Sequence, residues 1–160
     1  MKKNRGSAVI EMVLIMPLIL ILFIITIWGG QLMFTWTSIN YSATNAAMDA
    51  AKTGKVTDDI CTAALGNIKQ WVPGAKNLDE YISHDSNGPP CKPDKIVFWT
   101  PNDDDDPVPW KSEIKVAIVY PYKVDSPLLS LLGETFFGGD VIIYLKGEAM
   151  AQSEVLPEND

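Results

Sequence analysis

One carboxylate stands at the start of a long apolar run, and small residues stand just before it. The stretch reads Gly6-Ser7-Ala8-Val9-Ile10-Glu11, and the next charged residue after Glu11 is Asp49. A carboxylate at the edge of a membrane-spanning helix is costly, so it usually has a specific partner. Cleavage at Gly6 and Ser7 would leave the apolar helix attached to the mature protein. We therefore expect a processing site at Gly6 and Ser7, followed by a helix in which Glu11 makes a specific contact.

Cys61 and Cys91 are the two cysteines of the chain. Outside the cytoplasm, two cysteines pair more often than they stay reduced. A bridge would close a loop of about 30 residues and contribute roughly 3–4 kcal/mol in the chain-entropy model. The alternative is two reduced thiols in a host with little oxidative folding. Two cysteines are too few for a tetrahedral zinc site without other ligands.

An acidic run, which offers several carboxylate oxygens close together, is a candidate calcium site because hard cations prefer oxygen ligands. The spacing, glycine and distal glutamate of an EF-hand are missing, so a solvated loop tip is the alternative interpretation. The run consists of Asp103, Asp104, Asp105 and Asp106.

Composition argues against an enzyme and against a nucleic-acid partner. His84 is the single histidine and lies in a polar loop, which leaves no credible serine–histidine–acid set. The sequence has no glycine-rich phosphate loop and no metal motif, so we expect no cofactor. The formal net charge of -7 would repel the phosphates of a nucleic acid.

The apolar run is long enough to cross a bilayer. Met12 to Ile27 is apolar almost throughout, and with its flanks it exceeds the roughly 20 residues that a membrane helix needs. Lys2, Lys3 and Arg5 precede it, which predicts a cytoplasmic N-terminus and a C-terminal domain outside. The protein is therefore expected to be a single-pass protein of the cytoplasmic (inner) membrane.

Pro17 lies inside the predicted membrane helix. It removes one backbone hydrogen bond and crowds the carbonyl four residues earlier, so we expect a kink there. The alternatives are a proline that is simply tolerated, as is common in membrane helices, and a soft point that lets the helix bend beside copies of itself.

The pattern predicts an α+β chain in three parts. Residues 1–6 form a cytoplasmic leader peptide, and 7–54 form a long helix whose membrane part is about 8–32 and whose outer part is about 33–53. Residues 55–160 form an extracytoplasmic domain of a helix packed on a small, mainly antiparallel sheet. Alanines in the outer part of the long helix permit close approach of another element, and Thr53-Gly54 offers its C-terminal stop.

The outer domain should begin with a helix that Thr57 caps and Pro73-Gly74 ends. Its apolar face is predicted to contain Ile60, Ala64, Ile68 and Trp71. Strands are expected at 96–99, 113–124 and 141–151, followed by a frayed tail. Pro121 cannot donate to a ladder, so its end of the strand should be at an edge or leaving the sheet.

Two separated regions resemble one family, the TadE-like minor pilins (pseudopilins) of the tight-adherence class of type IV pili. The first is Arg5 to Glu11 with the apolar run containing Pro17. The second is Tyr120-Pro121-Tyr122, then 126–133, then Gly147-Glu148-Ala149-Met150-Ala151. Residues 56–112 show no such resemblance.

The resemblance implies that a membrane prepilin peptidase cuts after Gly6, so that Ser7 becomes the new N-terminus. Glu11 would then be the fifth residue and would pair with an N-terminal amine in the filament core. The implied function is a structural or priming subunit of a pilus, and the implied partners are other pilin and minor pilin subunits, the assembly platform and the lipid bilayer. After assembly the protein would lie on the pilus or cell surface. The alternative is an unprocessed, single-pass anchored protein whose outer domain binds a partner.

Overall fold

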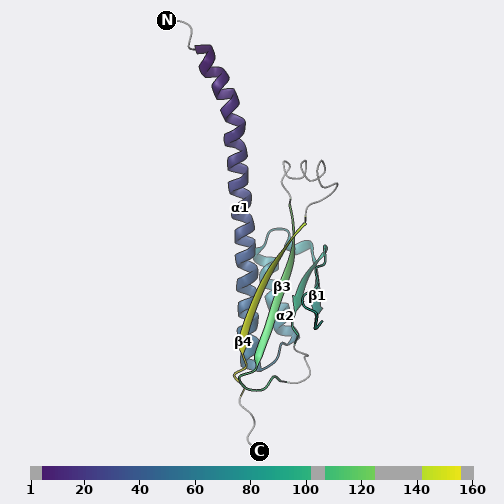
Figure 1. The fold of residues 1–160 in the computed structure, drawn as a ribbon. Helices are drawn as coiled ribbons and strands as arrows, with labels where there is room; N and C mark the ends of the chain where they lie inside the picture. Colours follow the sequence, from purple (N-terminus) through teal and green to yellow (C-terminus); the bar gives the residue numbers. More distant parts are fainter. Residues whose placement is uncertain (1–4, 102–106, 125–141, 156–160) are drawn as a thin grey trace, which may run out of the picture. The chain divides into compact units, whose positions relative to one another are not determined.

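The computed structural model describes residues 5–101, 107–124 and 142–155, with side chains from residue 10 onward. The chain divides into two compact units, residues 1–34 and 35–160. The first helix, α1 (Arg5–Thr53), belongs to both units (Figure 1). Its first part, up to residue 34, is the apolar segment. Its second part, from residue 35, belongs to a small α+β domain. The predicted fold class, a long N-terminal helix followed by a helix and a mostly antiparallel sheet, is confirmed.

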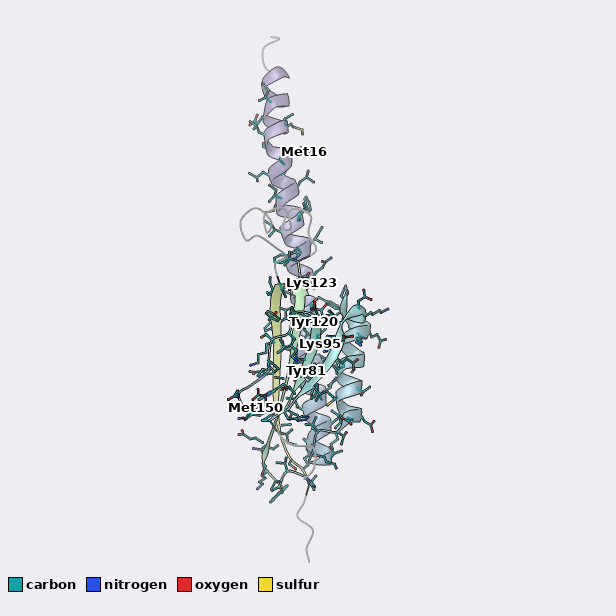
Figure 2. All side chains as sticks on the ribbon, turned by 90° about the vertical axis from the view of Figure 1, so that its right-hand side faces the viewer. Met16, Tyr81, Lys95, Tyr120, Lys123 and Met150 are labelled. Carbon is teal, nitrogen blue, oxygen red and sulfur yellow. The ribbon has the colours of Figure 1, made fainter. Side chains whose placement is uncertain are left out.

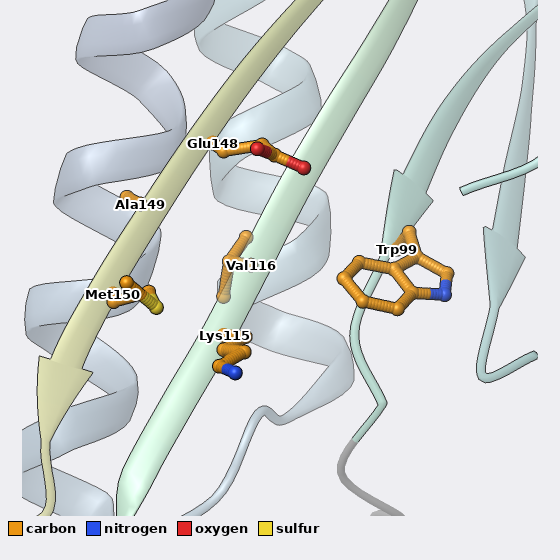
Figure 3. A pocket seen from close by; sticks show the side chains of 6 residues that line it. All are labelled: Trp99, Lys115, Val116, Glu148, Ala149 and Met150. Carbon is orange, nitrogen blue, oxygen red and sulfur yellow. The ribbon is translucent and has the colours of Figure 1, made fainter. Parts of the chain in front are cut away.

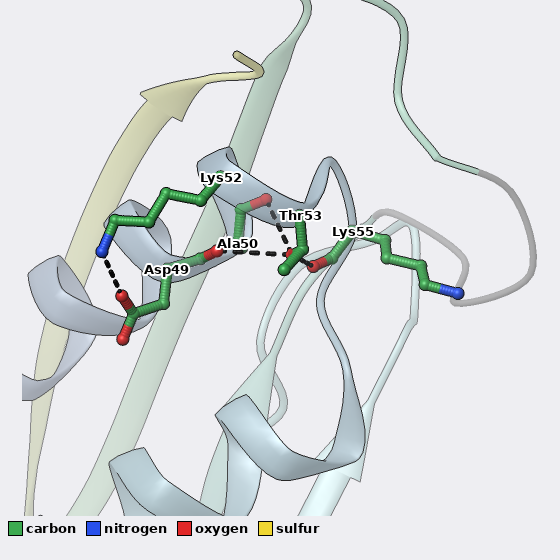
Figure 4. A network of polar contacts seen from close by, with 5 residues as sticks. All are labelled: Asp49, Ala50, Lys52, Thr53 and Lys55. Carbon is green, nitrogen blue, oxygen red and sulfur yellow. Dashed lines mark hydrogen bonds and ion pairs between the residues drawn. The ribbon is translucent and has the colours of Figure 1, made fainter. Parts of the chain in front are cut away.

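The end of α1 follows the predicted stop signal. Gly54 has φ 72°, a left-handed conformation that side chains with a Cβ rarely adopt and that ends helices. Thr53 Oγ1 lies 2.7 Å from the carbonyl oxygen of Lys55, which ties the helix end to the chain that follows (Figure 4). A hydrogen bond of 2.8 Å from Lys52 to Asp49, together with their charge attraction, raises the pKa of Lys52. Because its pKa is raised, the Lys52 ammonium group keeps its charge to a more alkaline pH than an isolated lysine would.

The second helix, α2 (Asp58–Trp71), begins after Thr57 as predicted and ends before Pro73, but the Thr57 hydroxyl makes no capping hydrogen bond. Asp58 and Asp59 lie in its first turn, where negative charge suits the helix dipole. Its buried residues are Cys61, Ala64, Leu65 and Ile68. The predicted apolar face is therefore partly wrong, because Trp71 is 59% exposed. Ala64 and Ile68 are buried as predicted, Ile60 is half-buried, and Cys61 and Leu65 complete the buried face.

A four-stranded sheet completes the domain in the order β1-β2-β3-β4. The strands are β1 (Asp79–Ser83), β2 (Lys95–Trp99), β3 (Glu113–Lys123) and β4 (Ile142–Gln152), and a short 3-10 turn, η1 (Ala75–Asn77), precedes β1. The β1–β2 pair is parallel, and the other two pairs are antiparallel. Strands β2, β3 and β4 match the expected ones closely. Strand β1 was not predicted, because its five residues are mostly exposed or half-buried and offer little apolar alternation.

The second part of α1 and all of α2 cover the same face of the sheet (Figure 1). Small residues permit this contact, since Ala43, Ala46, Ala47 and Ala50 on α1 are all buried. At Gly147 of β4, an added Cβ would lie 2.9 Å from a methyl group of Ile39 and 3.0 Å from the backbone nitrogen of Asn40. The close approach that the alanines predicted is therefore completed by a glycine on the facing strand.

The sheet carries the core of the domain. On β3, the helix-facing side chains of Ile114, Val116, Ile118 and Tyr120 are buried, and Phe98 on β2 is fully buried. Burial of one such side chain stabilises a fold by about 1.5–3 kcal/mol. Tyr120 keeps its hydroxyl satisfied by donating to the carbonyl oxygen of Pro73, 3.3 Å away.

The opposite face of the sheet is polar only toward its ends. Ala117 and Val119 on β3 are buried there, although Glu113, Lys115 and Lys123 on the same face are exposed. The segment between β1 and β2 is tied to this face: Trp99 Nε1 donates to the carbonyl oxygen of Asp85 at 2.7 Å, and Lys92 Nζ lies 3.3 Å from the centre of the Tyr81 ring. A parallel pair of strands needs such a crossover.

Pro121 lies within β3, where it pairs with Tyr144 of β4. The register pairs between β2 and β3 end at Val119, so the proline lies beyond the last of them. Its missing N–H therefore interrupts no pair of the β2–β3 register. The expected edge is thus found on one side of the strand, while the other side continues in the sheet to Lys123.

Candidate functional site

The apolar part of α1 presents its side chains outward on all sides. Every large apolar residue from Ile10 to Leu22 is among the exposed ones, apart from Pro17. The described part of the chain contains one helix that is long and apolar enough to cross a membrane, with a mean hydropathy of 2.9 in its best window and none of that window buried. An apolar surface of this size is unstable in water. The helix could therefore span a membrane.

The stretch with the predicted processing site lies at the beginning of this helix. Gly6 and Ser7 fall in the first turn of α1, which begins at Arg5. Glu11 lies about one turn further on, exposed between Ile10 and Met12. A carboxylate in such apolar surroundings is tolerable when a cation neutralises it. The helix thus places a single acid where a cationic partner would be held strongly.

Two other residues of the apolar segment affect its backbone. Helix α1 continues without a break through Pro17, so the predicted kink stays a prediction. Thr26 donates its hydroxyl to the carbonyl oxygen of Leu22 at 2.8 Å, which satisfies a polar group that has no water to bind within a membrane. The side chain therefore adds no unsatisfied donor to the apolar surface.

The structure places the two cysteines in different surroundings. Cys61 is buried on α2, and Cys91 is exposed in the segment before β2; no disulfide joins them among the described residues. The pairing therefore stays a prediction.

We expect the mature protein, produced in an oxidising compartment, to carry the Cys61–Cys91 bridge. The check is intact mass before and after reduction, and the expected result is a gain of two protons on reduction. A Cys91→Ser variant is the control, since it should show no such gain. Equal masses of the original protein under both conditions would remove the disulfide.

The calcium candidate, Asp103 to Asp106, lies outside the described residues, so its interpretation stays open. Within the described ranges, no group of three or more histidine, cysteine, aspartate or glutamate residues could hold a metal ion. The polar loop around His84 is exposed, as predicted.

A hollow of about 330 Å³ lies on the sheet face away from the helices (Figure 3). Its lining consists of Trp99, Lys115, Val116, Glu148, Ala149 and Met150. The two charged residues of the lining are Lys115 and Glu148, and each has a nearby partner. Lys115 Nζ lies 3.6 Å from Glu113 Oε2, and Glu148 pairs with Lys146 on β4. This pairing leaves the hollow without a convergent set of groups for acid–base or nucleophilic chemistry.

The stretch with the predicted processing site and most of the long helix match one known family model. Residues 6–51 match the model of the TadE-like protein family. Over this segment the chain is similar to that family. The match begins at Gly6 and ends two residues before the end of α1, so it covers Ser7, Glu11 and Pro17. No curated protein and no solved structure matches the chain.

The TadE-like match confirms the first of the two regions on which the resemblance rests. The second region, from Tyr120 to Ala151, lies outside the match, so its likeness to the family stays a prediction. Gly147 falls in that second region, and its contact with α1 was not foreseen. A lone glycine inside an otherwise regular strand is the signal that marks such a close approach.

Proposed function

We propose that this protein is a minor pilin of a tight-adherence type IV pilus, a structural or priming subunit and not an enzyme. One observation carries the proposal: the TadE-like segment begins at the small residue Gly6 and runs into an apolar helix with one carboxylate, Glu11, near its start. Cleavage after Gly6 would keep the helix and the carboxylate in the mature chain. A helix that is apolar on all sides suits lipid before assembly and other helices after it.

The proposed topology follows from the charges around the helix. Lys2, Lys3 and Arg5 precede the apolar segment, which favours a cytoplasmic N-terminus and an outer C-terminal domain in the inner membrane. A prepilin peptidase acting at the cytoplasmic side would then reach Gly6 and Ser7. Cleavage would free an amine on Ser7, which is a cation at neutral pH. Ser7 and Glu11 are only four residues apart, so the amine of one subunit could lie close to Glu11 of a neighbouring subunit when their helices pack side by side.

Processing is tested by intact mass of the membrane-extracted protein, produced together with a prepilin peptidase. The expected mature chain begins at Ser7. Gly6→Val should remain full length, because a branched side chain replaces the residue that the peptidase must hold at the cut. Gly29→Val is the matched control on the same helix, since an added Cβ there meets nothing within 4 Å, and it should be cut normally. An intact Met1 or Lys2 on the original protein would instead support the unprocessed membrane anchor.

A further inference from the structure

We propose that the α+β domain rests on the bilayer surface through three exposed aromatic side chains, Trp36, Trp71 and Tyr144, hereafter the aromatic rim. The inference rests on the proposed membrane anchoring and goes beyond it, because it assigns a lipid contact to the folded domain itself. The three residues are 46%, 59% and 39% exposed. Tryptophan and tyrosine are the residues that concentrate at membrane interfaces, where an apolar ring and a polar group are both satisfied.

The aromatic rim lies at one level of the sheet, within the domain. Trp36 Nε1 donates to the carbonyl oxygen of Lys146 at 3.3 Å, next to Leu145 on β4. Leu145 pairs with Tyr120, whose hydroxyl reaches Pro73, two residues after Trp71. Tyr144 precedes Leu145 directly. Three elements, α1, α2 and β4, therefore bring one aromatic residue each to the same level.

The length of chain between the proposed span and Trp36 limits how far this residue can lie from the membrane core. A hydrocarbon core of about 30 Å takes up about 20 helical residues, so a span that begins after Glu11 ends near residue 31. Trp36 follows five residues later on the same helix, roughly 7 Å beyond the core at 1.5 Å per residue. The headgroup layer is about 5–8 Å thick on each side, so Trp36 falls within it. The other two members of the rim share its level within the domain, and the proposal assigns them to the same layer.

Three lysines of the described residues near the rim have acidic partners, which favours an aromatic contact over an electrostatic one. Lys69, two residues before Trp71, lies 2.8 Å from Glu80, and Lys123 at the end of β3 lies 3.6 Å from Asp94. Lys146 is paired with Glu148. A surface with such balanced charge gains little from anionic lipid. We therefore expect the contact to form on zwitterionic phosphatidylcholine and to be insensitive to salt.

The opposite end of the sheet supplies a matched control. Trp110 is 47% exposed, and its neighbour Lys111 donates its backbone N–H to the carbonyl oxygen of Ser153, just beyond the end of β4. Ser153 is eight residues from Leu145, or about 26 Å along an extended strand. Figure 2 shows the two ends, with Tyr120 and Lys123 toward one and Met150 toward the other. A domain that rests on its aromatic rim holds Trp110 away from lipid.

The test is tryptophan quenching in the full chain, reconstituted in phosphatidylcholine vesicles brominated near the headgroup end of the acyl chains. We expect the quenched share of the emission to fall in Trp71→Phe and to rise in Trp110→Phe, where an unquenched tryptophan has been removed. Both side chains are exposed, so neither change should disturb the fold. A rise in Trp71→Phe like that in Trp110→Phe would overturn the inference.

Trp28, within the apolar segment, separates failure of this inference from failure of the anchoring. We expect the quenched share to fall in Trp28→Phe, because a membrane span would place this residue against lipid. A fall in Trp28→Phe without one in Trp71→Phe would leave the anchoring intact and overturn the lipid contact of the domain. No fall in either variant would overturn both.

Discussion

Replacement of Glu11 by alanine is expected to abolish or strongly weaken pilus assembly while leaving membrane insertion intact. The carboxylate lies alone on an apolar helix surface, so insertion should become easier when it is removed. Assembly should weaken because the variant removes one partner of the proposed ion pair. Removing one partner of a buried ion pair costs about 3–5 kcal/mol of stabilisation. A loss of about 3 kcal/mol corresponds to roughly a 100-fold loss in the equilibrium constant for adding a subunit. The measurement is piliation or recovery of sheared filaments, together with the amount of protein in the membrane fraction.

Two variants make the Glu11 result specific. Glu11→Gln keeps the size and hydrogen-bonding capacity of the side chain but removes its charge, so it should fail to assemble if a cationic amine is the partner. Glu113→Ala removes an exposed carboxylate on the sheet and should assemble normally. Unchanged piliation in Glu11→Ala would count decisively against the pairing role.

Replacement of Gly147 by alanine should destabilise the α+β domain by about 1–3 kcal/mol, the usual cost of overpacking. The added Cβ would lie 2.9 Å from a methyl group of Ile39 and about 3 Å from the backbone of Asn40. The backbone of a helix cannot yield as a flexible side chain can, so α1 and β4 would have to separate. Denaturant unfolding of the protein in detergent, followed by near-ultraviolet circular dichroism, measures the loss.

Gly66→Ala is the control for the Gly147 experiment. Gly66 lies on the exposed side of α2, and an added Cβ there would meet nothing within 4 Å. Since glycine costs a helix interior about 0.5–1 kcal/mol relative to alanine, this variant should be slightly more stable. Equal stability of Gly147→Ala and the original protein would show that α1 and β4 are not held as closely as described.

Local signals in the sequence were sufficient for most elements of the fold. The glycine at 54 and the capping position at Thr57 marked two helix boundaries to within a residue. The strand predicted at 113–124 matches β3 to within a residue. Signals of this kind depend on the residues of one segment alone, which is why they could be found without knowledge of the rest of the chain.

Features that depend on contacts between distant segments were missed. Ile60 and Cys61 lie on either side of the Ala64–Ile68 line of α2, and periodicity alone does not decide which of the two is buried more deeply. Strand β1 forms because β2 offers it a parallel partner, although Asp79 and Glu80 are poor strand residues. The aromatic rim depends on three elements that reach one level only after folding, so its members are scattered in the sequence.

The contact between α1 and β4 also covers part of the outer edge of the sheet, where an unpaired strand favours aggregation. Strand β4 is the last in the sheet and has 11 residues. Every second residue points its backbone N–H and C=O away from β3. Such a strand would readily pair with the same strand of a neighbouring copy. Trp36 Nε1 donates to the carbonyl oxygen of Lys146, and the backbone of Asn40 lies against Gly147. Just after β4, Glu154 donates its backbone N–H to the carbonyl oxygen of Ala51. For copies that lie side by side in a membrane, as proposed, these contacts hinder edge-to-edge pairing of their sheets. The long helices would then be the surfaces through which the copies associate.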